Sequence, residues 1–340
     1  MSGPPTPTPA DAAASGATAT VAVPALEVEQ LRKVFPTRGG ARPAGGEGAG
    51  GGAAGGSGAA GGEGAGGGAA GGGEGPRHAR WRPSGIVAVD DVSFAVAPGR
   101  SLAIVGESGS GKTTVARIVV GLERPSSGRI AVGGRERSWR HISSRERRLR
   151  GREAQIVFQD PYSSLDPRQS VRRCLDEALR LHFDWEADRR RQRVERLLEQ
   201  VGLDQRQGDA LPRALSGGQR QRVAIARALA CEPAVLICDE AVASLDVSIQ
   251  AQVLNLLSDI REETGVTYLF ISHDLAVVRQ LSDEVIVMRH GRVVERGATD
   301  EVLESPSHPY TKRLLAAIPR RGWHPAPSEE LPEDAPVSSG

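Results

Sequence analysis

Gly106-Glu107-Ser108-Gly109-Ser110-Gly111-Lys112-Thr113 is the stretch that decides the fold. It fits the pattern G-x-x-x-x-G-K-[ST], the phosphate-binding loop of nucleotide hydrolases. The apolar run at 101–105 predicts a buried parallel strand before the loop, and residues 114–120 predict a helix after it that stops at Gly121. Strand, loop and helix in this order are the context that the pattern requires, so we expect a nucleotide-binding α/β domain.

The chemistry of this loop, which we call the phosphate loop (residues 106–113), follows from its composition. Glycines let backbone N–H groups wrap a phosphate, and the helix N-terminus adds the positive end of a dipole. Lys112 is expected to reach the β- and γ-phosphates, and the Thr113 hydroxyl to ligate Mg²⁺. The loop residues expected to bind the nucleotide are Gly106, Ser108, Gly109, Ser110, Gly111, Lys112, Thr113 and Thr114.

Composition excludes several classes of function. The net charge of +1 argues against a protein held on nucleic acid by bulk electrostatics. No apolar run reaches the ~18–20 residues that span a bilayer, so a role at a membrane requires a partner. The cysteines Cys174, Cys231 and Cys238 lack metal-ligand spacing, and their odd number favours a reducing compartment. Residues 135–152 hold eight arginines and two glutamates, which we interpret as a solvated surface that contacts an acidic partner or lipid headgroups.

Domain boundaries follow from shifts in composition. Residues 1–24, rich in Pro, Thr and Ala, predict a disordered tail, and the alternating residues 25–31 predict the first strand. Residues 38–84 are an insertion dominated by Gly and Ala, in which the string GGEGAGGGAAGG occurs at 45–56 and again at 61–72. Such a segment has little to bury and predicts a flexible loop. The tail at 320–340 is also predicted to be loose.

Strands and helices alternate after the phosphate loop. Apolar runs at 235–238 and 267–271 predict buried strands, and runs at 285–288 and 293–295 are expected to close the globular part. The stretch 160–230 is mostly helical in character and is interpreted as an insertion in a parallel α/β sheet.

A second carboxylate-bearing position follows the strand at 235–238. Asp239 is expected to hold Mg²⁺, and Glu240, one residue further on, is the candidate general base for the attacking water. Leu215-Ser216-Gly217-Gly218-Gln219 places two glycines and a serine at a helix N-terminus, a second anion-binding feature in the same chain. The simplest explanation is a dimer in which this segment of each subunit caps the γ-phosphate bound by the other.

With these motifs the chain resembles the nucleotide-binding subunit of an ATP-binding-cassette (ABC) transporter, over residues 26–319 without the insertion. The resemblance implies a P-loop NTPase: an α/β fold with a RecA-like parallel sheet core, an antiparallel β subdomain and an inserted helical subdomain, together a domain at 25–319. In the family's terms, 215–219 is the signature segment and 244–246 the D-loop, whose Asp246 approaches the partner's nucleotide.

The resemblance also assigns further site residues. His273 matches the switch histidine that contacts the γ-phosphate, and Gln159 matches the glutamine that links Mg²⁺ and the attacking water to the membrane partner. Phe35 is the candidate for stacking on adenine, with Trp81 as its rival. The implied catalytic set is Lys112, Gln159, Glu240 and His273; the metal set is Thr113, Gln159 and Asp239; and Ser216, Gly217, Gly218, Gln219 and Asp246 are expected to contact nucleotide across a dimer.

Two stretches narrow the resemblance to a subgroup. Residues 158–168 and 305–315 resemble segments of dipeptide and oligopeptide importer ATPases, a subgroup that also contains nickel and glutathione importers. Ala241 stands where the family commonly has Pro, and Ala243-Ser244 replaces the usual Ser-Ala. The resemblance implies a peripheral protein at the cytoplasmic face of the membrane that uses ATP and Mg²⁺ and has no nucleic-acid partner. Its implied partners are two integral-membrane permease subunits, a second ATPase or another copy of itself, and, indirectly, an extracytoplasmic binding protein.

Two alternatives stay open on the sequence. One is the ATPase of an exporter for a peptide or drug. The other is a soluble ABC ATPase acting on DNA or the ribosome, although such proteins usually carry two cassettes or a long coiled coil.

Overall fold

A computed structural model describes residues 23–36, 85–140, 142–160 and 164–317. The insertion predicted at 38–84, Trp81 within it, the C-terminal tail and all but the last two residues of the N-terminal tail lie outside these ranges.

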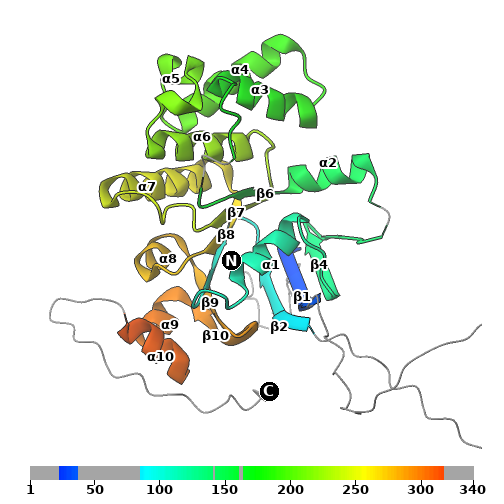
Figure 1. Cartoon of the computed structure of the whole chain (residues 1–340), viewed down its shortest axis with the longest axis vertical. Helices are drawn as coiled ribbons and strands as arrows, with labels where there is room; N and C mark the ends of the chain where they lie inside the picture. Colours follow the sequence, from blue (N-terminus) through cyan, green and yellow to red (C-terminus); the bar gives the residue numbers. More distant parts are fainter. Residues whose placement is uncertain (1–22, 37–84, 141, 161–163, 318–340) are drawn as a thin grey trace, which may run out of the picture.

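A six-stranded sheet carries the centre of the fold (Figure 1). Its strands are parallel except at one edge, where the last strand runs antiparallel to its neighbour. In spatial order they are β10 (Arg292–Ala298), β9 (Glu284–Arg289), β3 (Ser101–Val105), β8 (Thr267–Ile271), β7 (Val235–Asp239) and β6 (Ala154–Val157). Every residue of β3, β7 and β8 is buried, which explains why these strands are continuous apolar runs rather than alternating ones. The buried strands predicted from the sequence are confirmed.

An antiparallel sheet of four strands packs beside this core. In spatial order it contains β2 (Gly85–Val96), β1 (Leu26–Pro36), β4 (Ser127–Val132) and β5 (Arg135–Glu136). The pairing of β1 with β2 extends to Pro36 opposite Gly85. The chain therefore leaves the sheet at Pro36 and re-enters it directly alongside.

Helices cover the sheet and form a separate lobe at the top of Figure 1. The lobe contains α3 (Val171–His182), α4 (Ala187–Gln200), α5 (Gln205–Asp209) and α6 (Gly217–Leu229). The other helices are α1 (Lys112–Val120), α2 (Ser144–Glu153), α7 (Val247–Thr264), α8 (Leu275–Leu281), α9 (Thr299–Glu304) and α10 (Pro309–Ala316). The inserted helical subdomain is thus present.

The two faces of the six-stranded sheet belong to two hydrophobic cores. In β3, Leu102 and Ile104 pack with the antiparallel sheet and α1, whereas Ala103 and Val105 pack with α7, α8 and the helical lobe. Successive side chains of a strand point to opposite faces, so one short strand joins both cores. The phosphate loop follows β3 and is therefore held from both sides.

Three features differ from the sequence-based expectations. The strand β6 is not among the predicted ones, because its four residues (AQIV) form too short an apolar run to be recognised. The prediction that β10 closes the globular part is wrong, since α9 and α10 follow it and Tyr310 is only 1% exposed in the core. The segment 135–152 is not entirely a solvated surface, because Arg137 and Arg150 are buried.

The buried arginines have partners within the chain, although Arg137 Nε, Arg137 Nη2 and Arg150 Nη1 have no hydrogen-bond partner among the described residues. Arg150 pairs with Glu146 at 2.7 Å, and Arg135 binds both Glu146 and Glu153. Arg137 donates to the carbonyl of Val119 at the end of α1. Burial lowers the pKa of the Arg137 guanidinium to about 10, with Glu153 opposing the shift. Part of the arginine surplus therefore ties α2 to the core rather than facing a partner.

Candidate nucleotide site

The phosphate loop joins β3 to α1 in a conformation that needs its glycines. Gly106 and Gly111 have φ of 147° and 103°. A Cβ on Gly106 would lie 2.2 Å from the carbonyl oxygen of Met288, and one on Gly111 would lie 2.3 Å from that of Ala88. No side chain fits at such distances, so these two positions admit only glycine. Gly109 also has positive φ, but it faces open space.

Lys112 bends back over the loop in which it lies. Its ammonium donates to the carbonyls of Gly106 and Glu107, at 2.8 Å each, and the residue is 5% exposed. Burial lowers the pKa of the ammonium, while the carboxylates of Glu240, Asp239 and Glu107 oppose that shift. A phosphate would offer the buried ammonium the charge partner that two neutral carbonyls do not, so the loop fits a nucleotide.

Thr113 and Asp239 meet beneath the loop. The Thr113 hydroxyl donates to Asp239 Oδ1 across 3.1 Å, which brings together two of the predicted metal ligands. Burial raises the pKa of the Asp239 carboxyl; the hydrogen bond from Thr113 opposes this rise and the nearby Glu240 adds to it. A carboxylate that is costly to bury and has a hydroxyl beside it suits a divalent cation.

Few side chains near the phosphate loop are suited to bind a metal ion. Among the residues that the structure describes, no group of three or more His, Cys, Asp or Glu side chains gathers to enclose a metal. Mg²⁺ typically binds one or two protein oxygens together with water and substrate phosphates. Thr113 and Asp239 therefore fit a cation that arrives with a nucleotide.

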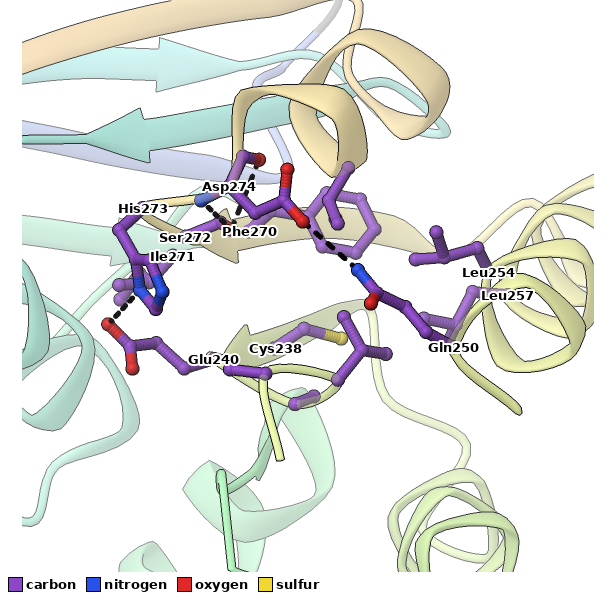
Figure 2. A pocket seen from close by; sticks show the side chains of 14 residues that line it. Cys238, Glu240, Gln250, Leu254, Leu257, Phe270, Ile271, Ser272, His273 and Asp274 are labelled. Atoms are coloured by element: carbon purple, nitrogen blue, oxygen red, sulfur yellow. Dashed lines mark hydrogen bonds and ion pairs between the residues drawn. The ribbon is translucent and has the colours of Figure 1, made fainter. Parts of the chain in front are cut away.

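Glu240 turns away from its neighbour Asp239 because its backbone is left-handed, with φ of 50°. Its amide donates to the carbonyl of Ile271, which fixes β7 against β8 at this edge of the sheet. Figure 2 shows its carboxylate facing the imidazole of His273, with Glu240 Oε1 and His273 Nδ1 3.1 Å apart. The candidate base and the predicted switch histidine are thus brought together.

A second contact in Figure 2 connects this edge to the helix that follows the D-loop. Gln250 on α7 donates to Asp274 Oδ2 at 3.1 Å, and Asp274 caps α8 directly after His273. The sequence analysis missed Gln250, and no local pattern could have found it, because the contact joins two elements.

The signature segment lies on the helical lobe, at the start of α6. Ser216 Oγ accepts from the amide of Gln219, and Gln219 Oε1 accepts from the amide of Ser216. This capping box satisfies two helix N-terminal donors. Ser216 is exposed, and in the described part of the chain no hydrogen bond joins residues 216–219 to the phosphate loop. Within the described residues of one chain, the two predicted anion sites are therefore not joined by hydrogen bonds.

In the part of the chain that the structure describes, no hydrogen bond or ion pair joins the side chains of three predicted residues to the phosphate loop. Gln159 is exposed, and its backbone carbonyl accepts from the Ser244 hydroxyl at 3.3 Å, so its metal role stays a prediction. Asp246 is exposed at the start of α7, beside Val247, which is 83% exposed. Phe35, near the end of β1, is 37% exposed with Lys33 Nζ 4.7 Å from its ring centroid, and its stacking role stays a prediction.

The comparisons with known proteins agree with the resemblance to ABC transporter ATPases. A family model described as "ABC transporter" matches residues 89–243. The Dipeptide transport ATP-binding protein DppF of Haemophilus influenzae is 46% identical over 239 residues, which cover 70% of this chain and 72% of that protein. The chain belongs to the ABC transporter family. It is an ABC-type ATPase, and the phosphate loop, the acidic pair after β7 and the signature segment are parts of an ABC cassette.

Other ABC relatives refine the comparison. A model described as "Oligopeptide/dipeptide transporter, C-terminal region" matches residues 294–337. The Oligopeptide transport ATP-binding protein OppF of Bacillus subtilis is 47% identical over 240 residues, covering 70% of this chain and 78% of that protein. The Glutathione import ATP-binding protein GsiA of Salmonella typhimurium is 47% identical over 232 residues, but these span only 37% of that longer protein.

Solved structures agree in fold. The ABC protein cbiO1 from Clostridium perfringens, part of the transporter complex cbiONQ, superposes with a TM-score of 0.62 at 27% identity, covering 83% of this chain and 91% of that one. The ATP-binding cassette MJ0796, in a dimeric post-hydrolysis state with ADP and Pi, gives 0.61 at 24% identity, covering 81% and 98%. In the described part of this chain no helix is both long enough and apolar enough to cross a bilayer.

Proposed function

We propose that this chain is the ATP-hydrolysing subunit of an ABC importer that takes up dipeptides or oligopeptides. The observation that carries the cargo assignment is the match of residues 294–337 to the oligopeptide/dipeptide transporter C-terminal region. The DppF and OppF relatives, at 46% and 47% identity, support it. ATP hydrolysis itself belongs to the family.

In this proposal the residues at the sheet edge divide the work. Lys112 and the loop amides hold the phosphates, and Thr113 and Asp239 hold Mg²⁺, which when bound neutralises charge on the phosphates. Glu240 accepts the proton of the attacking water, and His273, 3.1 Å from it, orients that carboxylate and the γ-phosphate. Phe35 stacks on the base. Catalysis then rests on positioning and on charge neutralisation.

The exposure of Ser216, and the lack of a hydrogen bond from its segment to the phosphate loop in the described residues, support a two-subunit arrangement. We propose that Ser216–Gln219 of one subunit caps the nucleotide held by the other, with Asp246 at the interface. ATP favours the closed pair because it binds that state more tightly, and hydrolysis releases it. The second subunit is a related ATPase or another copy of this chain.

The remaining partners lie at the membrane. We propose that the chain sits on the cytoplasmic face, bound to two permease subunits, and that the loop with Gln159 transmits closure to them. An extracytoplasmic binding protein delivers the peptide. Nucleic acid has no part in this cycle.

A pull-down from native membranes tests the proposal. Tagged Glu240→Gln protein with ATP is expected to retain two multi-span proteins, a second ATPase when the pair is mixed, and a binding protein whose ligand is a peptide. Membrane vesicles that carry the wild-type complex should then take up labelled dipeptide when ATP is present on the cytoplasmic side. Recovery of ribosomes or DNA-repair proteins, or ATP-driven movement of peptide in the opposite direction, would replace the importer with one of the two alternatives.

A further inference from the structure

The phosphate loop is held from outside by a residue 203 positions further along the chain. The hydroxyl of Tyr310, on α10, accepts a hydrogen bond from the amide of Glu107 at 3.1 Å. Tyr310 is 1% exposed, whereas Glu107 is exposed, so the contact is buried on the tyrosine side. All of helix α10 except its last residue lies in the segment 305–315, which we call the C-terminal strap.

The hydrogen bond acts on one particular peptide group. The carbonyl of Gly106 and the amide of Glu107 belong to the same peptide, and Lys112 Nζ donates to that carbonyl at 2.8 Å. A trans peptide is planar and points its C=O and N–H in opposite directions. Lys112 and Tyr310 therefore hold the two ends of a single plane, and together they fix its orientation.

The strap that carries Tyr310 is itself well anchored. The carboxylate of Glu295, on β10, accepts from the amide and the hydroxyl of Ser307 at 2.6 and 2.7 Å. The ring of Tyr310 packs under the guanidinium of Arg289, whose Cζ is 5.2 Å from the ring centroid. Arg289 is the last residue of β9, and the preceding Met288 places its carbonyl oxygen against Gly106. Strand β9 and helix α10, both from the C-terminal part of the fold, therefore contact the start of the phosphate loop.

We propose that Tyr310 is a positioning residue for nucleotide binding: its hydroxyl fixes the Gly106–Glu107 peptide and thereby makes the C-terminal strap part of the nucleotide site. Rotation of this peptide plane would remove an acceptor from Lys112 and redirect the start of the loop. The inference rests only on nucleotide binding by the phosphate loop, and holds whatever the cargo is.

The test compares two identical substitutions in the purified full-length protein. Tyr310→Phe removes the hydroxyl and keeps the ring. Tyr268→Phe is the matched control, because Tyr268 is also 1% exposed and its hydroxyl bonds a backbone group, the carbonyl of Leu257 at 3.0 Å, away from the loop. We expect Tyr310→Phe to raise the Kd for MgATP about three- to tenfold, the effect of one lost hydrogen bond, and Tyr268→Phe to leave it within about twofold of wild type.

Steady-state kinetics of the membrane-bound complex add a second readout. Tyr310→Phe should raise KM for ATP while kcat at saturating ATP stays within about twofold, because the hydroxyl does not touch the reacting atoms. An unchanged Kd in Tyr310→Phe, or equal losses of affinity in both variants, would overturn the proposal. Failure of the wild-type protein to bind ATP would instead contradict the assigned ATPase function.

A double-mutant cycle tests the route through the strap. Glu295→Gln weakens the anchoring of Ser307 without touching the loop, and we expect a smaller rise in Kd of the same sign. Combined with Tyr310→Phe it should add little, because both changes act through one contact. Full additivity of the two effects on ln Kd would show that the strap does not act through Tyr310.

Discussion

At the residue scale, the end of β7 places two adjacent carboxylates in different surroundings. Asp239 points to Thr113 beneath the phosphate loop, while the left-handed backbone at Glu240 turns the next carboxylate toward His273. The sequence predicted this division of roles because both residues stand at fixed offsets from a recognisable strand. It could not predict the tie between Gln250 and Asp274, whose partners lie on separate elements.

We predict that Glu240→Gln retains ATP and loses turnover. The amide preserves the shape of the side chain but cannot accept the proton of the water, so kcat of the complex should fall at least about 100-fold while the Kd for ATP stays within about threefold. Glu262→Gln, an exposed change on α7, is the control and should leave both values unaltered. A Glu240→Gln variant that hydrolyses ATP at near wild-type rate would exclude Glu240 as the base.

At the element scale, α6 packs so closely against α7 that one glycine of the signature segment, but not the other, is needed for lack of space. A Cβ on Gly218 would lie 2.4 Å from Ile249 Cγ2, whereas one on Gly217 would meet Leu245 at an ordinary 3.8 Å. We predict that Gly218→Ala lowers the free energy of unfolding by about 1–3 kcal/mol and that Gly217→Ala changes it by less than about 1 kcal/mol. Denaturant titration of the two variants measures the difference; equal stabilities would mean that Ile249 moves aside without cost.

The arginine cluster around α2 is the second case at this scale. Glu146 pairs with Arg135 and with Arg150, which is 4% exposed, so Glu146→Gln should cost about 1–3 kcal/mol of stability at pH 7. The control pair, Asp188 with Arg191, is exposed at the start of α4, and Asp188→Asn should cost less than about 1 kcal/mol.

Acid should remove the effect of Glu146→Gln. Hydrogen bonds from Arg135 and Arg150 hold the pKa of the Glu146 carboxyl below its ordinary 4.5. Its stabilising contribution is therefore complete above about pH 4.5 and is lost as the pH falls through the lower folded-state value. Thermal unfolding of wild type and variant from pH 7 downward should show their difference shrink below that range. A difference that stays constant or grows would contradict the assigned pairing.

At the scale of the whole molecule, our proposal requires a second subunit to complete the nucleotide site, because in the described residues no hydrogen bond joins the exposed Ser216 to the phosphate loop of its own chain. We predict that Ser216→Arg, which places a bulky charge at the proposed interface, leaves the ATP affinity of the isolated subunit within about twofold. ATPase activity of the complex should fall at least about tenfold. Equal loss of both would place Ser216 in its own subunit's site.

Sequence patterns predicted the fold at this scale, except where an element is held by contacts between residues far apart in the sequence. Continuous apolar runs predict the strands β3, β7 and β8, and a sequence motif predicts the phosphate loop. Residues 305–315 were recognised by resemblance alone, because the contact of Tyr310 with Glu107 joins positions 203 residues apart in the sequence. The burial of Arg137 was likewise invisible, since a run of arginines is equally typical of a solvated surface.

The pairing of Pro36 with Gly85 has a consequence for how well the fold tolerates inserted residues. The ladder between β1 and β2 fixes these two residues side by side. For any flexible chain that joins two fixed ends, the free energy of closure grows only with the logarithm of its length, about 0.6 kcal/mol per doubling. A change in the number of residues between Pro36 and Gly85 should therefore cost the fold little stability as long as the ladder is kept. The position between Pro36 and Gly85 is therefore suited to engineering. A fluorescent label or a purification tag inserted there would leave the pairing of β1 with β2 in register.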